Sequence, residues 1–398
     1  MVCRAWNACA RILNSTEHDK DAEVKYPIGI QSFDQIIENG FVYVDKTDMV
    51  HSLAHEGKAY FLSRPRRFGK SLLLSTFKAY FEGKRALFKG LKLEALEKDW
   101  HSHAIFHFDF NGIDYTMPNA LRAKLDGCLS RWELEYGVSP GPDFNPASRF
   151  EQIIRAAAKQ SGRGVVVLID EYDKPLLDVL ARDESLLEEN RQILKAFYGV
   201  FKLADANLRF VMLTGVTKFA LLSLESSLNQ LLDISMVRRY EAICGMTEEE
   251  IDAEFGEAIG DMAKAQDGGE AEVREQLKAH CGGYHFSEGM KDICNPLSVL
   301  NAFHVLDIRD CRFATEMPSW LNRLMNHSHE DIDQLAGQYY PRDAFMNCRA
   351  DAAHPLPMLY QSGCLTIKAY DRRRKTFLLD FPNNEVKNGF LTLAASSC

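Results

Sequence analysis

A short apolar stretch that runs into a glycine–lysine–serine triplet and then into a helical pattern constrains this chain more than any other feature. Residues 59–62 (AYFL) read as a strand, residues 64–71 (RPRRFGKS) follow, and residues 72–81 have the apolar spacing of a helix. This order is the setting of a P-loop, in which backbone N–H groups at a helix N-terminus face a polyphosphate. Lys70 would reach the β- and γ-phosphates and the Ser71 hydroxyl would bind Mg²⁺. The predicted nucleotide-binding residues are Arg66, Arg67, Phe68, Gly69, Lys70, Ser71 and Leu72.

The motif is incomplete, because the pattern G-x-x-x-x-G-K-[ST] begins with a glycine and this chain has Arg64 there. Such a triplet also arises by chance, and the alternative is a helix N-cap with a charged first turn. Arg66 and Arg67 have two interpretations as well. They neutralise phosphate charge beside Lys70, or they pair with acids on the rim of the sheet.

A second motif lies about a hundred residues further on. Residues 164–169 (GVVVLI) form a continuous apolar run, typical of a strand buried on both faces of a parallel sheet, and Asp170 and Glu171 follow it. Buried carboxylates at a strand end need compensation, which a metal ion supplies. We predict that Asp170 holds Mg²⁺ and that Glu171 polarises the attacking water. The alternative is a strand that ends in a polar turn, but the two motifs together favour nucleotide binding.

Alternating patterns predict an α/β fold with a parallel sheet. Strands are expected at 41–44, 59–62, 104–110, 164–169 and 208–213, with Thr47 as a helix cap and helices near 118–136, 147–160 and 187–204. The strand at 104–110 leaves room for another strand between the P-loop strand and the acidic strand, as in additional-strand P-loop ATPases. Thr214, at the end of the 208–213 strand, is then expected to read the γ-phosphate or, alternatively, to cap the next helix.

The pattern changes from about residue 246. A capping box at residues 247–250 (TEEE) opens a helix, and helices are expected to dominate to about residue 345. Two strands at 364–370 and 376–381 are expected to form a hairpin around a turn at 371–375. That turn carries four cations, which would touch DNA phosphates or merely be the charges of an exposed turn: Arg372, Arg373, Arg374 and Lys375.

Charge and composition restrict the remaining possibilities. The 398-residue chain carries a formal net charge of −9, so a nucleic-acid or membrane partner would have to meet a local basic patch. We find no apolar run long enough for a transmembrane helix and no secretion signal at the N-terminus. Ten cysteines without C-x-x-C spacing indicate reduced thiols, and we therefore expect a cytoplasmic protein.

Taken together, the motifs resemble the AAA-ATPase-like family, whose members are bacterial proteins. The resemblance implies an AAA+-like P-loop NTPase core at 26–245 after a flexible segment at 1–25, a helical lid at 246–345, and a winged-helix or β-hairpin region at 346–398. It also makes Arg64 a family feature. Many members continue into a PD-(D/E)xK nuclease-like domain, which we expect to be absent here. The matching segments are YPIGI (26–30), YVDKT (43–47), FLSRPRRFGKS (61–71), LIDEYDKP (168–175), TGVTKF (214–219), CGMTEEE (244–250), GYHF (283–286), NPLS (295–298) and LYQSGCLTI (359–367).

The expected function is that of a Mg²⁺-dependent ATPase that couples ATP hydrolysis to conformational switching. A nucleotide-dependent switch with negligible turnover and a nucleic-acid-binding regulatory module are the alternatives, and homo-oligomer formation is left open. Residues 45–47 would contact adenine or form a surface turn. Arg238 and Arg239 would act as an arginine finger or as solvated charges. We expect only structural roles for Asp109 and His285.

Overall fold

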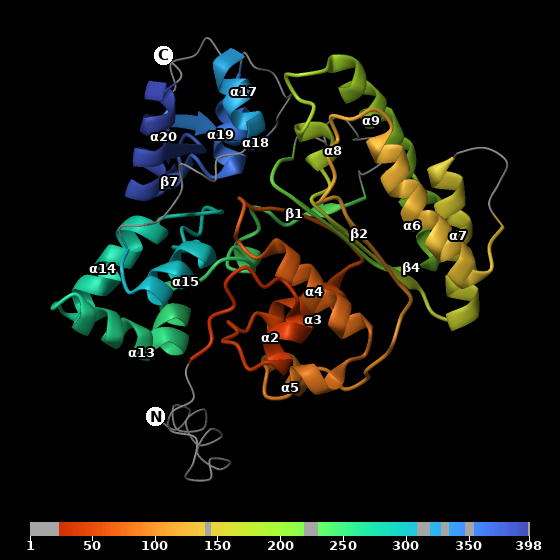
Figure 1. Ribbon diagram of the computed structural model, residues 1–398, viewed down its shortest axis with the longest axis horizontal. Helices are drawn as coiled ribbons and strands as arrows, with labels where there is room; N and C mark the ends of the chain where they lie inside the picture. The colour runs from red at the N-terminus through yellow and green to blue at the C-terminus, as the bar shows by residue number, and fades with distance from the viewer. Residues whose placement is uncertain are drawn as a thin grey trace, which may run out of the picture.

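The fold is organised around a five-stranded parallel sheet, seen in the computed structural model in Figure 1. The structure describes residues 24–139, 145–218, 230–308, 319–327, 334–346 and 354–396. Most of the predicted flexible segment at 1–25 therefore lies outside the described residues. The strand order is β2-β3-β4-β1-β5, with β1 at Ala59–Ser63, β2 at Ile105–Asp109, β3 at Val165–Asp170, β4 at Leu208–Gly215 and β5 at Leu232–Asp233.

The predicted inserted strand is present. β4 lies between β1, which leads into the P-loop, and β3, which ends in the acidic pair. The 104–110 segment, β2, occupies the outer side of β3 instead. Every residue of β3 is buried, in agreement with its continuous apolar sequence.

Helices cover both faces of the sheet. Alternate strand residues point to opposite sides, so each face presents apolar side chains that are buried against helices. On one face, Phe106 and Phe108 of β2 pack against Trp132, Phe150 and Phe197. These aromatic residues come from α6 (Ala120–Tyr136), α7 (Pro146–Ser161) and α9 (Glu184–Tyr198). The other face is covered by α2 (Phe33–Glu38), α3 (Thr47–Glu56) and α4 (Lys70–Phe81). Shorter helices are α5 (Lys92–Leu96), α8 (Lys174–Leu177) and α10 (Val200–Leu203).

Two local expectations are wrong. Residues 41–44 are not a strand, because only Phe41 forms an isolated bridge, to Lys25. Thr47 is the first residue of α3 and not its cap; the N-cap position is Lys46, and the Asp45 carboxylate accepts hydrogen bonds from both the amide and the hydroxyl of Thr47. Asp45, two residues earlier, thus accepts a hydrogen bond from a free amide at the start of α3, which is the role that the sequence predicted for Thr47.

Three helices follow the sheet and form a separate hydrophobic cluster, at the left of Figure 1. They are α13 (Glu248–Ala265), α14 (Glu270–Cys281) and α15 (Pro296–Val305). The predicted capping box is present, since Thr247 and Glu250 each bond the other's backbone amide. Tyr26 and Ile28, from the start of the described chain, pack against this cluster. The N-terminal segment therefore connects the helical cluster to the sheet.

The remaining segment forms a small antiparallel sheet with helices around it. Its strand order is β6-β8-β7, and the predicted hairpin is β7 (Thr366–Asp371) and β8 (Thr376–Asp380). The third strand, β6 (Gln338–Pro341), lies where only helices were expected. The helices are α17 (Ser319–His327), α18 (Arg342–Met346), α19 (Leu356–Ser362) and α20 (Asn384–Ser396). No helix in the described ranges is both long and apolar enough to cross a membrane.

Candidate functional site

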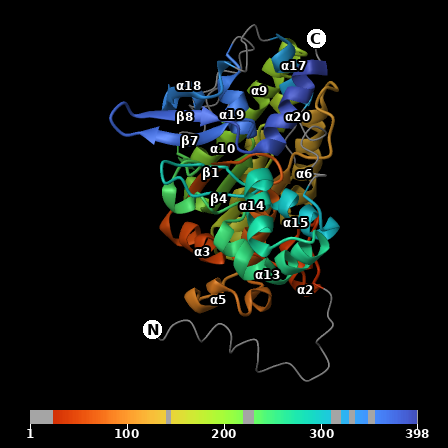
Figure 2. The same ribbon diagram turned by 90° about the vertical axis from the view of Figure 1, so that its left-hand side faces the viewer.

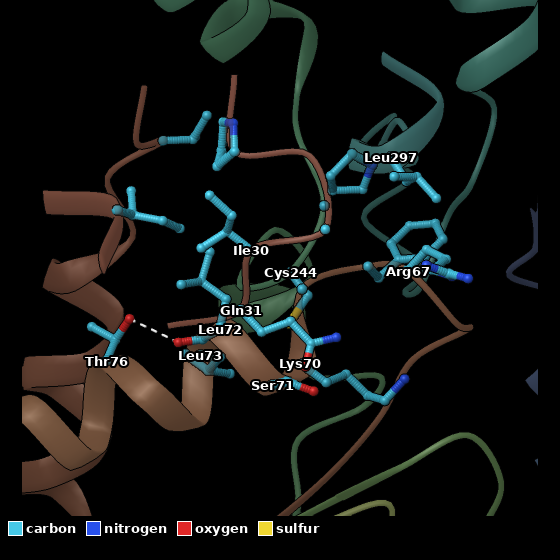
Figure 3. A pocket seen from close by; sticks show the side chains of 18 of the residues that line it. Ile30, Gln31, Arg67, Lys70, Ser71, Leu72, Leu73, Thr76, Cys244 and Leu297 are labelled. Atoms are coloured by element: carbon cyan, nitrogen blue, oxygen red, sulfur yellow. Dashed lines mark hydrogen bonds between the residues drawn. The ribbon is translucent and has the colours of Figure 1, made fainter. Parts of the chain in front are cut away.

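A cavity of about 610 Å³ opens above the carboxyl ends of the parallel strands (Figure 3). Its walls come from parts of the chain that are far apart in sequence. The P-loop and the residue after β3 supply the polar wall, with Arg66, Arg67, Phe68, Gly69, Lys70, Ser71, Leu72 and Glu171. The more apolar wall contains Ile30, Val42, Tyr43, Cys244, Gly245, Met246, Pro296, Leu297 and Leu300.

The P-loop turns sharply from β1 into α4. Gly69 is the N-cap of α4 and has φ 91°, in the left-handed region that favours glycine. Leu73 donates the first intrahelical bond, to the Gly69 carbonyl at 3.0 Å. Helix geometry leaves the amides before it without intrahelical partners, and the positive end of the helix dipole lies there too. This end of α4 is thus suited to an anionic ligand.

Lys70 is buried at the floor of the cavity. Its ammonium donates to the carbonyl oxygens of Arg64 and Pro65, at 3.1 Å each, and lies 3.9 Å from the Glu171 carboxylate. These contacts place the one lysine of the P-loop between the loop backbone and the acidic motif. An anionic ligand above α4 would compete with two carbonyls for this cation.

The acidic pair occupies two different environments. The Asp170 carboxylate is only 2% exposed, and one of its oxygens accepts bonds from the Thr214 hydroxyl (2.7 Å) and the Glu171 amide (3.0 Å). Asp170 and Thr214 thus meet beneath the cavity without lining it. Glu171 has φ 52°, and its side chain lines the cavity. The sharp turn after β3 therefore directs the two carboxylates to different places.

The turn that holds Glu171 is fixed to the end of β4. Tyr172 donates its amide to the Thr214 carbonyl (3.0 Å) and its hydroxyl to the Thr217 carbonyl (2.8 Å). The Asp173 carboxylate accepts from the Thr217 amide and hydroxyl, at 2.7 and 2.8 Å. Burial, followed by the nearby charge of Glu171, raises the pKa of Asp173 to about 6. Gly215 is required here, because a Cβ would lie 2.5 Å from the Tyr172 ring.

Arg64, in place of the first glycine, has a structural explanation. Its side chain is 1% exposed and points away from the cavity. The guanidinium donates to four carbonyls, those of Ser63 (2.9 Å), Ser235 (2.8 Å), Tyr240 (3.1 Å) and Glu241 (3.3 Å), and lies 4.1 Å from the centre of the Phe286 ring. An arginine at this position thus ties the start of the P-loop to residues 235–241.

Phe68 makes a second connection. Its ring packs edge-on against Tyr284 and Phe286, with centroids 4.9 and 5.5 Å away, and its carbonyl accepts from the Gly245 amide at 2.9 Å. Gly363 approaches Pro65 so closely that a Cβ would lie 2.7 Å from the proline ring. The P-loop therefore contacts three later segments of the chain.

The other residues that the sequence suggested as functional lie at the cavity, in ion pairs, in the packed interior or at the hairpin turn. Lys46 lines the cavity and forms a half-buried ion pair with Glu250 of α13 at 2.6 Å. Arg239 pairs with Glu56 of the same chain at 2.6 Å. His285 bonds the Ile367 carbonyl at 2.8 Å, and burial lowers its pKa, as for a packed histidine. The four basic residues at 372–375 are exposed at the end of the β7–β8 hairpin, which extends from the molecule in Figure 2.

Sequence reasoning missed two parts of the site. Asp109, given only a structural role, lines the cavity, because it is the register partner of Asp170 at the end of neighbouring β2. The shared edge of parallel strands was a signal that could have found it. The apolar wall from residues 243–246 and α15 had no comparable signal, since it depends on how the helical cluster packs against the P-loop.

Comparison with known proteins identifies the family of this chain. The family described as "Predicted AAA-ATPase" matches residues 27–225, which include both motifs. An uncharacterized protein in the vnfD 5′ region of Azotobacter chroococcum mcd 1 is 37% identical over 368 residues, which cover 91% of this chain and 68% of that protein. The chain belongs to the predicted AAA-ATPase family, and an ATP-binding, ATPase-like function is what that membership indicates.

Proposed function

We propose that the protein binds ATP with Mg²⁺ in the cavity above α4 and hydrolyses it. The observation that carries this proposal is the meeting of four features in one place. The N-terminus of α4, the Lys70 ammonium, the Ser71 hydroxyl and the Glu171 carboxylate all border the same cavity, at the carboxyl edge of a parallel sheet. This is where ligands bind in open α/β sheets.

The roles follow from the chemistry of each group. The amides of residues 66–72 and the Lys70 ammonium would bind the phosphates. Ser71 and Asp170 would hold Mg²⁺, and the donor set fits, because hydroxyl and carboxylate oxygens are ligands that Mg²⁺ prefers. The ion would neutralise charge that develops on the phosphates. Glu171 would accept a proton from the attacking water. Thr214 would act at the γ-phosphate side through its hydroxyl, which donates to Asp170 and would orient that carboxylate.

The apolar wall would receive the base. Ile30, Met246 and Leu297 also line the cavity, and apolar side chains suit a planar heteroaromatic ring. This wall is shared by the N-terminal segment, the chain before α13 and α15. We propose residues 246–345 as a helical lid and residues 346–398 as a winged-helix region whose positions respond to the nucleotide. The contacts of Phe68 with Gly245 and Tyr284 support such coupling.

Two variants test the assignment, with a control on the same helix. Lys70→Ala should abolish ATP binding measured by calorimetry, whereas Lys78→Ala, which removes a half-buried lysine paired with Glu82, should not. Glu171→Gln should retain binding and lose about 10²–10⁴-fold in hydrolysis, the usual contribution of a positioned acid–base group. Unchanged affinity in Lys70→Ala would refute the site.

A nucleotide-dependent switch with negligible turnover is the second candidate. The contacts of Phe68 with Gly245 and Tyr284 support this candidate, because they link the loop to later segments whether or not ATP is hydrolysed. The Glu171→Gln comparison separates the two functions, because a switch would hydrolyse ATP equally slowly with either residue. We further propose DNA contact by residues 372–375, self-association and a cytoplasmic location; the first two can be measured on the same purified protein.

A further inference from the structure

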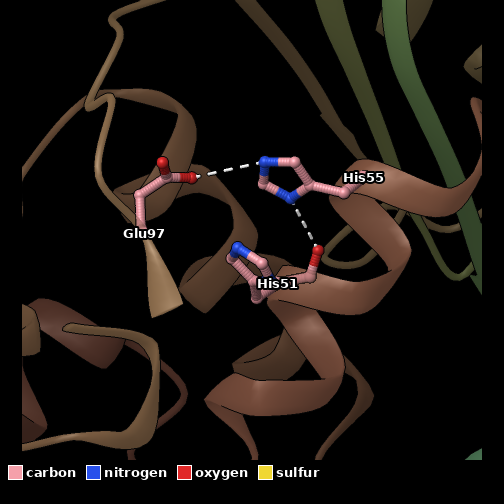
Figure 4. A group of neighbouring side chains, drawn as sticks. All are labelled: His51, His55 and Glu97. Atoms are coloured by element: carbon pink, nitrogen blue, oxygen red, sulfur yellow. Dashed lines mark hydrogen bonds and ion pairs between the residues drawn. The ribbon is translucent and has the colours of Figure 1, made fainter. Parts of the chain in front are cut away.

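A second group of chemically active side chains lies on the face of the sheet covered by α3. His51 and His55 are one turn apart on α3, and Glu97 immediately follows α5 (Figure 4). In the described part of the chain, His51, His55 and Glu97 form a group whose potential ligand atoms come close enough together to hold a metal ion. None of the three lines the ATP cavity.

The spacing of the three atoms is near that of a metal site. The His55 Nε2 atom lies 3.5 Å from a Glu97 carboxylate oxygen, and all three candidate ligand atoms lie within 4.8 Å of one another. Bonds of about 2.0–2.1 Å in tetrahedral geometry place two ligands about 3.3–3.5 Å apart. The pair His55–Glu97 already has this separation, and the His51 nitrogen lies within 4.8 Å of both atoms.

The outer contacts prepare His55 and Glu97 for this role. The His55 Nδ1 atom lies 2.9 Å from the His51 carbonyl, which can only accept, so the proton belongs on Nδ1 and the lone pair on Nε2 faces Glu97. Glu97 is buried and accepts bonds from the Tyr80 hydroxyl and from the amides of Lys98 and Asp99. Such hydrogen bonds orient the ligands of a metal site.

We propose that His51, His55 and Glu97 bind a divalent transition-metal ion of the Zn²⁺ class, with the fourth position open to solvent. Two imidazole nitrogens and one carboxylate suit Zn²⁺ and its neighbours, whereas Mg²⁺ prefers oxygen ligands throughout. The ion would join α3 to the chain after α5. The rival explanation is a simple ion pair between protonated His55 and Glu97.

The experiment uses the full chain after removal of metal with a chelator. Calorimetric titration with Zn²⁺ and the visible absorption of added Co²⁺ should both give one site, and tetrahedral Co²⁺ should absorb strongly. His51→Gln and His55→Gln should each weaken binding at least about 100-fold, because even an outer-shell partner is worth about 10–100-fold. His51 is half-buried and His55 is exposed, so both variants should fold, whereas Glu97→Gln alters the buried acceptor of the Tyr80 hydroxyl.

Two controls make the result specific. His280 on α14 forms the same bond to the carbonyl four residues earlier, at 2.9 Å, outside this group, and His280→Gln should bind Zn²⁺ like the wild type. Lys70→Ala should also retain Zn²⁺ while it loses ATP. Absence of a stoichiometric site in the wild type, or equal Zn²⁺ affinity in His55→Gln and His280→Gln, would overturn the proposal in favour of the ion pair.

Discussion

Replacing Arg64 with glycine would restore the usual first residue of the P-loop, and we predict that it damages the protein. The substitution removes a buried guanidinium that donates to four carbonyls and covers the Phe286 ring. The carbonyl of Tyr240 would keep a second donor, the Ile243 amide at 3.2 Å. The other three would lose a charged donor in a buried place.

The magnitude follows from these contacts. A buried acceptor left without its donor costs about 1 kcal/mol at the low end of the measured range, and the cation above the Phe286 ring contributes about 1 kcal/mol more. Arg64→Gly should therefore lower the free energy of unfolding by roughly 4 kcal/mol, similar to a large-to-small substitution in a core. Urea denaturation followed by circular dichroism measures this difference.

Arg66→Gly is the matched control, because Arg66 lies in the same loop and is exposed. The same substitution there should change the free energy of unfolding by less than about 1 kcal/mol, since surface changes have small effects. Equal stability of the two variants would falsify the view that Arg64 holds the loop to residues 235–241. A gain in ATP affinity in Arg64→Gly would also contradict this view of Arg64.

Three further predictions concern other residues. The folded pKa of Asp173, about 6, exceeds its unfolded value near 4, so its contribution to stability is fully present below pH 4 and is lost as the pH rises through 6, by up to roughly 3 kcal/mol. Denaturation of the wild type and of Asp173→Asn at pH 4.5 and 7 should show a weaker pH dependence in the variant. The same pH dependence in both proteins would exclude this contribution of Asp173. Thr214→Val should lower ATP hydrolysis about 10²-fold, because valine replaces the hydroxyl by a methyl group. Thr214→Ser keeps the hydroxyl and should retain most of the activity, and a fully active valine variant would remove Thr214 from the mechanism. Alanine at all four positions 372–375 should weaken duplex-DNA binding and flatten its salt dependence by about one unit per lost phosphate contact, as measured by fluorescence anisotropy at several salt concentrations; identical slopes, or no binding by the wild type at low salt, would leave the hairpin as a solvated turn.

The sheet was predictable because its strands carry their burial in the local sequence. β3 is apolar up to Asp170 and buried throughout, and the helices that follow β1 and β2 have regular apolar spacing. β6 could not be found in this way, since its residues are largely exposed and its strand structure depends on pairing with β8. A local hydrophobic pattern indicates burial, and a strand on the edge of a small sheet buries few residues, so it leaves no clear pattern in the sequence.

The candidate site was predictable only in its polar half. Lys70, Ser71 and Glu171 follow from short motifs, because phosphate chemistry requires those groups at a strand end or a helix start. In the sequence Arg64 is only a missing glycine, because its role depends on acceptors that lie about 170 residues further along the chain. The pairing of His55 with Glu97 likewise depends on the packing of α3 against the chain after α5.

The connections of the P-loop also bear on where this protein can be divided. The family match ends at residue 225, yet β1 pairs with β5 at Leu232–Asp233, and Phe68 is covered by Tyr284 and Phe286. A fragment cut at residue 225 would retain both motifs and lose the backbone and rings that enclose the loop. We therefore do not expect the end of the family match to be a boundary of autonomous folding, and truncation studies should keep residues 26–286 together at the least.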